Sequence, residues 1–345
     1  MGLTGNTRVV QIHPTRRCNL RCLHCYSSSS PVETEMLKVE LLCAAVSDAV
    51  AEGYNWVSLS GGEPLLYPAL EQLLAHAKAA GMGTAVVSNG MLLSPRRLDR
   101  LAPVLDLCVL SIDGIPASHN HMRGSTRAFE LMASHLTLLR ERRVRFGFLF
   151  TLTQHNLHEL PWVIDFALTQ GASLLQVHPL EAAGAATQHL VGSVPDKVEA
   201  AYAWALREQM YKTLGERLPM QIDLVYSKFV QNHPERFYAT PEPAHADICL
   251  GEVISPLVIE PDAVVVPLRY GFPRTFALGT LHQASLRTLA RHWRTQGCTA
   301  LQAVCREAYR HICQQTTPYF LNWYEMVSKI AADQEAQWSH TAPEL

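Results

Sequence analysis

The stretch VVQIHPTRRCNLRCLHCY, residues 9–26, joins an apolar, β-branched run to three cysteines that lie within eight residues of one another. The apolar run predicts a buried strand, so the cysteines follow directly on its end. The other six cysteines are scattered along the chain. Disulfide frameworks are typical of short secreted proteins, so this group indicates metal or redox chemistry.

The bulk composition excludes several classes of protein. The chain has 345 residues, 48% hydrophobic and 17% charged, which predicts one large folded domain and a smaller one. The net charge of −2 gives no basic field for nucleic acid or an anionic membrane. The N-terminus lacks a signal-peptide core, and no apolar run is long enough to span a bilayer. We therefore expect a cytoplasmic protein without nucleic-acid or membrane partners.

Three interpretations of the cysteine group remain open on spacing alone. A structural zinc site would need a fourth ligand, such as His24 or His13. A redox pair would use Cys22 and Cys25 and leave Cys18 incidental. An iron–sulfur cluster held by Cys18, Cys22 and Cys25 would leave one iron free to bind another molecule, and the spacing favours this third interpretation.

Short apolar runs alternate with helix-like segments, which predicts βα units around a parallel sheet. The predicted strands cover residues 9–15, 56–62, 84–90, 107–114, 146–153 and 174–181. The predicted helices between them cover about 34–52, 68–80, 94–102, 125–142 and 157–169.

Polar side chains recur two residues apart near the end of each predicted strand. Residues two apart share one face of a strand. The pairs are Gln11 with His13, Ser58 with Ser60, Val86 with Ser88, Ser111 with Asp113, Thr151 with Thr153, and Gln176 with His178. The alternating residues, such as Ile12, Leu59, Val87, Leu110, Ile112, Leu152 and Val177, are expected to pack under the helices. A polar inner face at the carboxyl ends of parallel strands is where α/β barrels place their sites.

The loops after these strands carry further candidates. After the second strand, Gly61-Gly62-Glu63-Pro64 would let backbone approach a ligand closely, and Glu63 could bind an ammonium group. After the third comes Ser88-Asn89-Gly90, and after the fourth Asp113 is followed by Arg123, which could bind a carboxylate.

Together, C-x3-C-x2-C followed by Tyr26, then GGEP, SNG, SIDG and HMRG resemble the radical S-adenosylmethionine superfamily over about residues 9–181. The resemblance implies a partial (β/α)6 TIM-like barrel in which Cys18, Cys22 and Cys25 bind a 4Fe-4S cluster. It also implies that the fourth iron chelates S-adenosylmethionine, whose reductive cleavage yields a 5′-deoxyadenosyl radical.

The same resemblance assigns residues to S-adenosylmethionine. Glu63 and the backbone of Gly61, Gly62 and Pro64 would lie at the methionine amino group, and Arg123 near its carboxylate. Residues near the methionine or ribose would be Ser88, Asn89, Ser111 and Asp113, with Tyr26 near adenine. His24 would then not be a ligand.

Beyond the cofactor, the inner face offers candidates for substrate contact or proton transfer: Thr151, Thr153, Gln176 and His178. Of these, Thr153, Gln176 and His178 are the predicted catalytic residues. Cys43 and Cys108 are expected to pack under helices.

Residues 191–345 are predicted to form a helical linker and a smaller α+β extension after the barrel of residues 1–190. A helix at about 195–216, a hairpin around Pro261-Asp262-Ala263 and later helices resemble a degenerate SPASM or twitch extension, with Cys249 before the hairpin. Leu268 stands where a cysteine is common, so a second cluster is not expected. Helical spacing predicts that Cys298, Cys305 and Cys313 face a core.

The main hypothesis is a radical enzyme that modifies a ribosomally made precursor peptide by cross-linking, epimerisation or backbone cleavage. For epimerisation, Cys249 or Cys313 could return hydrogen. The expected partners are a precursor peptide or small-molecule substrate and a one-electron donor of the flavodoxin or ferredoxin type. Because few residues precede the first strand, a leader peptide is expected to bind the C-terminal region or a separate leader-peptide-binding protein. The alternatives are a small-molecule enzyme of cofactor, tetrapyrrole or sugar pathways, and a non-enzymatic metal-bound sensor.

Overall fold

The computed structural model of the chain describes residues 7–238 and 248–341. Its main feature is a ten-stranded sheet in the order β11-β10-β9-β1-β2-β3-β4-β5-β6-β7. The strands from β1 to β7 are parallel and consecutive: β1 Val9–Ile12, β2 Trp56–Leu59, β3 Gly83–Ser88, β4 Leu107–Ile112, β5 Phe146–Leu152, β6 Leu175–Pro179 and β7 Met220–Ile222. All six predicted barrel strands are therefore confirmed, and the fold is an α/β partial barrel.

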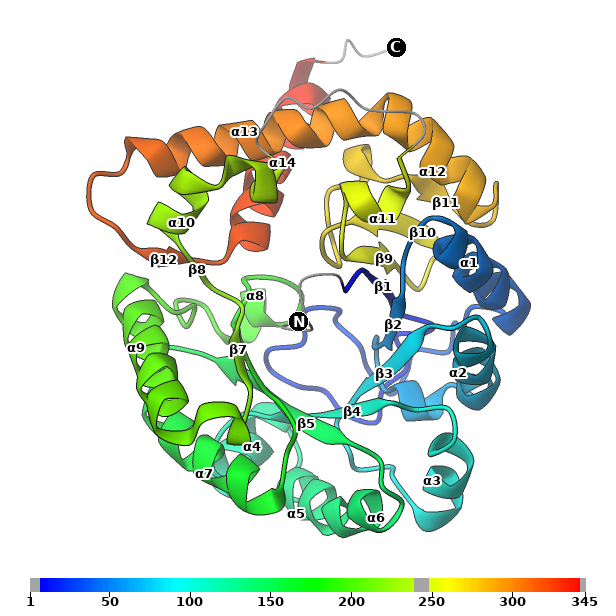
Figure 1. The fold of residues 1–345 in the computed structure, drawn as a ribbon, viewed down its shortest axis with the longest axis vertical. Helices are drawn as coiled ribbons and strands as arrows, with labels where there is room; N and C mark the ends of the chain where they lie inside the picture. Colours follow the sequence, from blue (N-terminus) through cyan, green and yellow to red (C-terminus); the bar gives the residue numbers. More distant parts are fainter. Residues whose placement is uncertain (1–6, 239–247, 342–345) are drawn as a thin grey trace.

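Helices cover the outside of this curved sheet, as Figure 1 shows. They are α1 Val39–Ala51, α2 Leu70–Ala79, α3 Pro95–Leu101, α5 Ala128–Ser134, α6 Leu136–Glu141, α7 Leu160–Gln170 and α9 Lys197–Leu214. The helix predicted over 125–142 is divided into α5 and α6 at His135, whose Nδ1 lies 2.8 Å from the carbonyl oxygen of Gly90.

Helix α4, Pro116–Arg123, was expected to be part of a loop. Its sequence carries two local signals that favour a helix. Pro116 occupies the first turn, where its missing N–H costs nothing, and Gly124 ends the helix with φ of 61°. This helix places Arg123 in its last turn, at the edge of the barrel.

The inner and outer faces follow the predicted alternation except in β3. Ile12, Leu59, Leu110, Leu152 and Val177 all belong to the main core under the helices. In β3 it is Val86 that packs in this core, because its register neighbours are Leu59 and Cys108. Val87 packs instead with a small second cluster of Ala85, Leu107 and Val109. The predicted faces of Val86, Val87 and Ser88 were thus wrong by one residue: Val86, and not Val87, packs under the helices.

The C-terminal region continues the barrel sheet. Strand β9, Leu257–Ile259, pairs in parallel with β1 and forms an antiparallel hairpin with β10, Val264–Pro267, which pairs with β11, Gly279–Thr280. The predicted hairpin is confirmed, and Ala263 has φ of 65° in its turn. The sheet is not interrupted near residue 190. Strand β7 continues it beyond β6, and β9, β10 and β11 continue it beyond β1.

The remaining elements lie on the side of the molecule opposite β4 and β5 (Figure 1). They include η4 Pro234–Phe237, α10 Ser227–Asn232, α11 Leu250–Val253, α12 Leu286–Thr295, α13 Gly297–Gln314, α14 Trp323–Thr341, and the short pair β8 Val225–Tyr226 with β12 Phe320–Leu321. Cys298 and Cys305 are buried in the core as predicted, whereas Cys313 is exposed, because it lies at the last turn of α13 beyond the core-facing positions.

Candidate active site

The three cysteines lie in a loop after β1 that several distant segments hold in place. The Cys18 N–H donates to the Ser30 carbonyl at 3.1 Å, which closes the loop on itself. The Leu23 N–H donates to the Met122 carbonyl of α4 at 2.9 Å, and the Ala185 N–H donates to the Cys25 carbonyl at 2.8 Å. The loop is therefore fixed between the ends of β4 and β6.

The thiols lie near enough to influence one another electrostatically. Burial raises the pKa of Cys18 to about 12, and negative charge on Glu63, Cys22 or Cys25 would add to this shift. Burial also raises the pKa of Cys22 to about 11, although the guanidinium of Arg123 opposes the change. Arg123 Nη1 lies 3.8 Å from Cys22 Sγ. Thiolates in this loop would thus need positive charge for stabilisation, which a bound metal group would provide.

The GGEP loop packs directly on the start of the cysteine loop. A Cβ on Gly61 would lie 2.6 Å from the Thr15 carbonyl oxygen, and one on Gly62 would lie 2.2 Å from that of Arg17. The Gly62 N–H donates to Thr15 O and the Glu63 N–H to Arg17 O, both at 2.9 Å. The glycines therefore allow a close approach of the chain to itself, where the sequence suggested approach to a ligand.

Glu63 is completely buried and joins this loop to the end of β3. Its carboxylate accepts hydrogen bonds from Ser88 Oγ at 2.8 Å, from the Asn89 N–H at 2.9 Å and from the Leu65 N–H at 3.1 Å. Burial raises the pKa of Glu63, while these bonds oppose the shift. Pro64, also buried, begins the single turn η1 (Pro64–Leu66) that follows. In this conformation the Glu63 carboxylate holds the backbone of the loops after β2 and β3 in position.

The SNG loop after β3 reaches the cysteine loop through its amide side chain. Asn89 Nδ2 donates to Asn19 Oδ1 at 2.8 Å, and Asn89 Oδ1 accepts from the Met91 N–H at 3.0 Å. Loops from four strand ends, those of β2, β3, β4 and β6, are thereby connected to the loop that carries the thiols.

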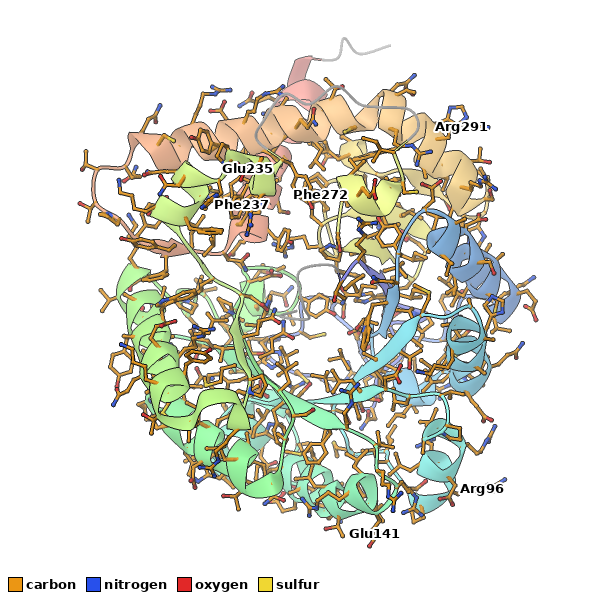
Figure 2. The ribbon with its side chains drawn as sticks, in the orientation of Figure 1. Arg96, Glu141, Glu235, Phe237, Phe272 and Arg291 are labelled. Carbon is orange, nitrogen blue, oxygen red and sulfur yellow. The ribbon has the colours of Figure 1, made fainter. Side chains whose placement is uncertain are left out.

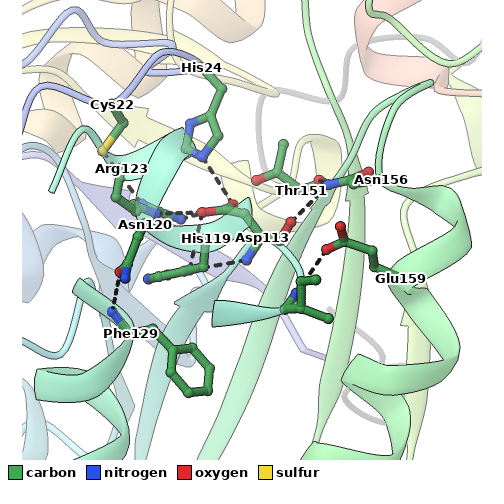
Figure 3. A network of polar contacts seen from close by, with 11 residues as sticks. Cys22, His24, Asp113, His119, Asn120, Arg123, Phe129, Thr151, Asn156 and Glu159 are labelled. Carbon is green, nitrogen blue, oxygen red and sulfur yellow. Dashed lines mark hydrogen bonds and ion pairs between the residues drawn. The ribbon is translucent and has the colours of Figure 1, made fainter. Parts of the chain in front are cut away.

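Asp113 is the centre of a buried polar network at the end of β4 (Figure 3). Arg123 donates to both of its oxygens, from Nε at 2.6 Å and from Nη2 at 3.1 Å. His24 Nε2 lies 3.0 Å from Oδ1. Although burial alone would raise it, the guanidinium of Arg123, together with the contacts from His24 and His119, holds the pKa of Asp113 well below its usual range. Arg123 thus pairs with Asp113, and His24 is bound to a carboxylate rather than pointing at the thiols. Ser111, two residues earlier on the same face, is also buried.

Sequence reasoning missed three buried residues around Asp113. His119 Nδ1 accepts from the Asp113 N–H at 3.2 Å, and Asn156 Nδ2 donates to the Asp113 carbonyl at 3.1 Å. Glu159 accepts from the Ile115 N–H at 2.8 Å (Figure 3). His119 and Arg123 are four residues apart on one face of α4, so predicting that helix would have linked them.

Tyr26 lies in an aromatic group between the barrel and the C-terminal region. Its ring centroid is 5.3 Å from that of Tyr270, and its hydroxyl lies 3.3 Å from Ser60 Oγ. His13 packs against Tyr270 at 4.7 Å, and burial lowers the pKa of His13 to about 3. The His13 ring is therefore enclosed by the rings of Tyr26 and Tyr270.

The predicted catalytic residues divide into two groups. Thr153 Oγ1 accepts from the His155 N–H at 3.1 Å, so its hydroxyl stabilises a turn. Gln176 and His178 instead converge on Asp223, a residue that follows β7 and that the sequence did not single out. Gln176 Nε2 is 2.6 Å and His178 Nδ1 is 2.8 Å from Asp223 Oδ2.

His178 also interacts with Glu181, which connects this group to the C-terminal region. His178 Nε2 lies 3.6 Å from Glu181 Oε1, and Arg269 Nη2 donates to Glu181 Oε2 at 2.6 Å. Burial opposes protonation, but the hydrogen bonds to Asp223 and Glu181 outweigh it and raise the pKa of His178 to about 10. The imidazole is therefore a cation held between two carboxylates.

The sequence of the segment that carries these loops matches a known protein family. The family model of the Radical SAM superfamily matches residues 12–167, which include the cysteine loop and the loops after β2, β3 and β4. Residues 12–167, somewhat less than half of the chain, therefore match a radical SAM domain.

Two curated relatives differ in the kind of molecule that their names mention. Fe-coproporphyrin III synthase of Methanosarcina barkeri is 33% identical over 159 residues, covering 46% of this chain and 40% of the relative. PqqA peptide cyclase of Ruegeria pomeroyi is 28% identical over 260 residues, covering 73% of this chain and 65% of the relative. The chain thus spans less than two thirds of each relative's length.

Solved structures share the fold across both regions of the chain. The anSMEcpe structure with bound AdoMet has a TM-score of 0.65 and 16% identity, covering 97% of this chain and 98% of that protein. Streptococcus suis SuiB bound to S-adenosylmethionine also has a TM-score of 0.65, at 15% identity over 86% of this chain and 68% of that protein. These likenesses show the fold. Within the described residues, no helix is long and apolar enough to cross a bilayer.

Proposed function

We propose that this chain is a radical S-adenosylmethionine enzyme that modifies a peptide. One observation carries the proposal: loops from four strand ends all bond to the segment of residues 15–26. The bonds are Gly62 to Thr15, Asn89 to Asn19, Arg123 to Cys22 and Ala185 to Cys25. The motifs that define the superfamily thus converge on the three thiols.

The donor set suits an iron–sulfur cluster better than a single ion. Within residues 7–238 and 248–341, no three His, Cys, Asp or Glu side chains are gathered in a way that would hold one metal ion. A 4Fe-4S cluster would instead bind each of Cys18, Cys22 and Cys25 to a different iron. Three soft sulfur donors in one half-buried loop, with Arg123 beside them, fit an anionic cluster.

The residues of the chain then have separable tasks. Bound together, the cluster and S-adenosylmethionine would supply a 5′-deoxyadenosyl radical that removes hydrogen from a C–H bond. Glu63 fixes the backbone of the loops after β2 and β3, and Asp113 fixes Arg123 and His24 beside the thiols. Their burial excludes water from the edge of the site.

The proposal also assigns residues to the substrate and names further partners. Gln176 and His178 would contact the substrate from the end of β6, while Thr153 would shape the adjoining turn. The proposal also includes a flavodoxin-type or ferredoxin-type electron donor, a separate leader-peptide-binding protein and a cytoplasmic location, where such donors and reduced thiols occur.

The first test is anaerobic reconstitution of the full chain, followed by measurement of iron, sulfide and 5′-deoxyadenosine. The wild type should hold about four irons and form 5′-deoxyadenosine from S-adenosylmethionine and a reductant. The variant with Cys18, Cys22 and Cys25 changed to Ala should lose both, while Cys43→Ala should keep both. Zinc without iron, or iron that survives in the triple variant, would overturn the proposal.

A tetrapyrrole substrate is the second candidate, favoured by the 33% identity to Fe-coproporphyrin III synthase. Incubating the reconstituted enzyme with coproporphyrin III or with candidate peptides separates the two. Formation of 5′-deoxyadenosine that increases only with the porphyrin would replace the peptide half of the proposal and leave the radical half intact.

A further inference from the structure

A cavity of about 360 Å³ lies on the outside of the barrel, between the end of α1 and the start of α12. Helix α12 packs against α1, and Figure 1 shows both helices in the outer ring of the molecule. The cavity is lined by Ala51 and Glu52, by Ile248 and Cys249, and by residues of α12 and its cap, namely Ser285, Arg287, Thr288, Arg291 and Arg294. It is therefore separate from the loops that bear the superfamily motifs.

The lining has an excess of positive charge. Arg287, Arg291 and Arg294 stand against Glu52, the one acidic side chain among the described residues that line the cavity. Glu52 is only 5% exposed, and its carboxylate accepts hydrogen bonds from the Leu250 N–H at 2.9 Å and from Arg294 Nη1. Glu52 thus balances Arg294, and the charges of the other two arginines remain.

Arg287 and Arg291 are exposed, and neither guanidinium has a hydrogen-bond or ion-pair partner within the part of the chain that the structure describes. Only the backbone N–H of Arg287 is bonded, to Asp48 Oδ2 at 3.1 Å. Like charges four residues apart on a helix repel each other, and Arg287 lies in the first turn, where the helix dipole disfavours a cation. The sequence from residue 263 to residue 306 contains six arginines and no Asp or Glu. A bound anion would relieve this repulsion.

The spacing of the two free arginines suits carboxylates from separate residues. An α-helix rises about 1.5 Å per residue, so Arg287 and Arg291 start about 6 Å apart along the axis. In an extended peptide, side chains two residues apart share a face and start about 6.6 Å apart. Two carboxylates at alternate positions could therefore each meet one guanidinium, which is a pairing that arginine favours. A single phosphate would instead need both guanidiniums to converge.

We propose that this cavity binds an acidic, extended segment of a peptide substrate, whose carboxylates at alternate positions pair with Arg287 and Arg291. This inference rests on the proposed function, because it names the part of the peptide that the C-terminal region holds. Since the cavity lies outside the barrel, the acidic segment is distinct from the residue that is modified.

Cys249 on the cavity wall allows binding to be tested at the site itself. The full-length protein, reconstituted anaerobically, is alkylated with iodoacetamide, and the rate at Cys249 is followed by mass spectrometry with and without acetyl-Glu-Ala-Glu-Ala-Glu-amide. The same peptide with Gln in place of Glu is the control, and inorganic phosphate represents the competing class of ligand. The exposed Cys313 is the internal reference.

We expect the Glu peptide to slow alkylation of Cys249 but not of Cys313, and high salt to remove this protection. Arg287→Gln and Arg291→Gln should each weaken binding about threefold. Arg96 is the matched control, because it is exposed and is the second residue of α3, as Arg287 is of α12. Figure 2 shows Arg96 at the end of the molecule opposite Arg291. Arg96→Gln should leave binding unchanged, and all three variants should form 5′-deoxyadenosine as the wild type does.

The absence of protection by the Glu peptide overturns the inference, as does equal protection by the Gln peptide. Binding that Arg287→Gln and Arg291→Gln both leave intact also overturns it, and so does protection by phosphate alone. Wild type that forms 5′-deoxyadenosine without binding the Glu peptide refutes only this inference, while binding without 5′-deoxyadenosine refutes the proposed radical function.

Discussion

The rim of the barrel at β1–β4 and the rim at β5–β7 are built in different ways. At β1–β4 the polar groups are buried and bonded to one another, with Asp113 only 1% exposed. At β5–β7 the side chain of His178 is 33% exposed. It contacts Asp223 and Glu181, and Glu181 is in turn bonded to Arg269. The first rim is therefore held rigid by contacts among its own groups, whereas the second is accessible and joins the barrel to the C-terminal region.

Replacing Asp113 by Asn should have the largest effect, because it leaves Arg123 buried without its full counter-charge. Breaking a buried ion pair from one side costs about 3–5 kcal/mol, so the free energy of unfolding in urea should fall by that amount. The exposed pair of Asp99 and Arg142, with a contact of 2.7 Å, is the matched control. Asp99→Asn should cost less than about 1 kcal/mol. Equal losses in the two variants would contradict the rigid first rim.

Gly62→Ala should come next, because a Cβ there would lie 2.2 Å from the Arg17 carbonyl oxygen. The loop after β2 would have to move away from the cysteine loop, at a cost of about 2–3 kcal/mol. Gly192, with φ of 75° and open space around it, is the control, and Gly192→Ala should cost only about 1 kcal/mol. Urea unfolding measures both, and a Gly62→Ala variant as stable as Gly192→Ala would show that the close approach is not required.

The first rim could be read from the sequence because its parts are short motifs at strand ends. The strands themselves were predictable from apolar runs, since parallel strands are buried on both faces. The error in β3 has a physical cause. Its residues Ala85, Val86 and Val87 are all apolar, so periodicity could not decide which of them faces inward, and only pairing with Leu59 and Cys108 decides it.

The second rim could be predicted only in part. The alternation in β6 identified Gln176 and His178, but their partner Asp223 lies in a segment without a motif and 45 residues beyond His178. Arg269 is more distant still, 88 residues from Glu181. Such pairs form because β7 and the hairpin of β9 and β10 extend the sheet at its two ends, which local sequence patterns do not encode.

The charge on His178 provides a test of the second rim. Its pKa of about 10 in the folded protein lies above the ordinary value of about 6.5, so its stabilising contribution is complete below pH 6.5 and is lost as the pH rises through about 10. His178→Gln should therefore be less stable than wild type by about 1–2 kcal/mol at pH 6, and the difference should disappear above pH 10.

An NMR titration that follows the ring signals of His178 measures its pKa directly. The imidazole should still be protonated at pH 8, and Asp223→Asn should lower its pKa because one of the two carboxylates is removed. If His178 titrates near 6.5 in the wild type, the cation between two carboxylates does not exist and the second rim is less ordered than its contacts indicate.

The smallest expected effect concerns two cysteines of α13, which extends the comparison to the C-terminal region. Cys305 is fully buried, so Cys305→Ala should remove packing worth about 1 kcal/mol in urea unfolding. Cys313 is exposed, so Cys313→Ala should change stability by less than about 0.5 kcal/mol, and its thiol should react with a disulfide reagent in the native protein while Cys305 stays protected. Rapid native-state labelling of Cys305 would mean that α13 opens readily, and the C-terminal side would then be a flexible cover over the second rim rather than part of its frame.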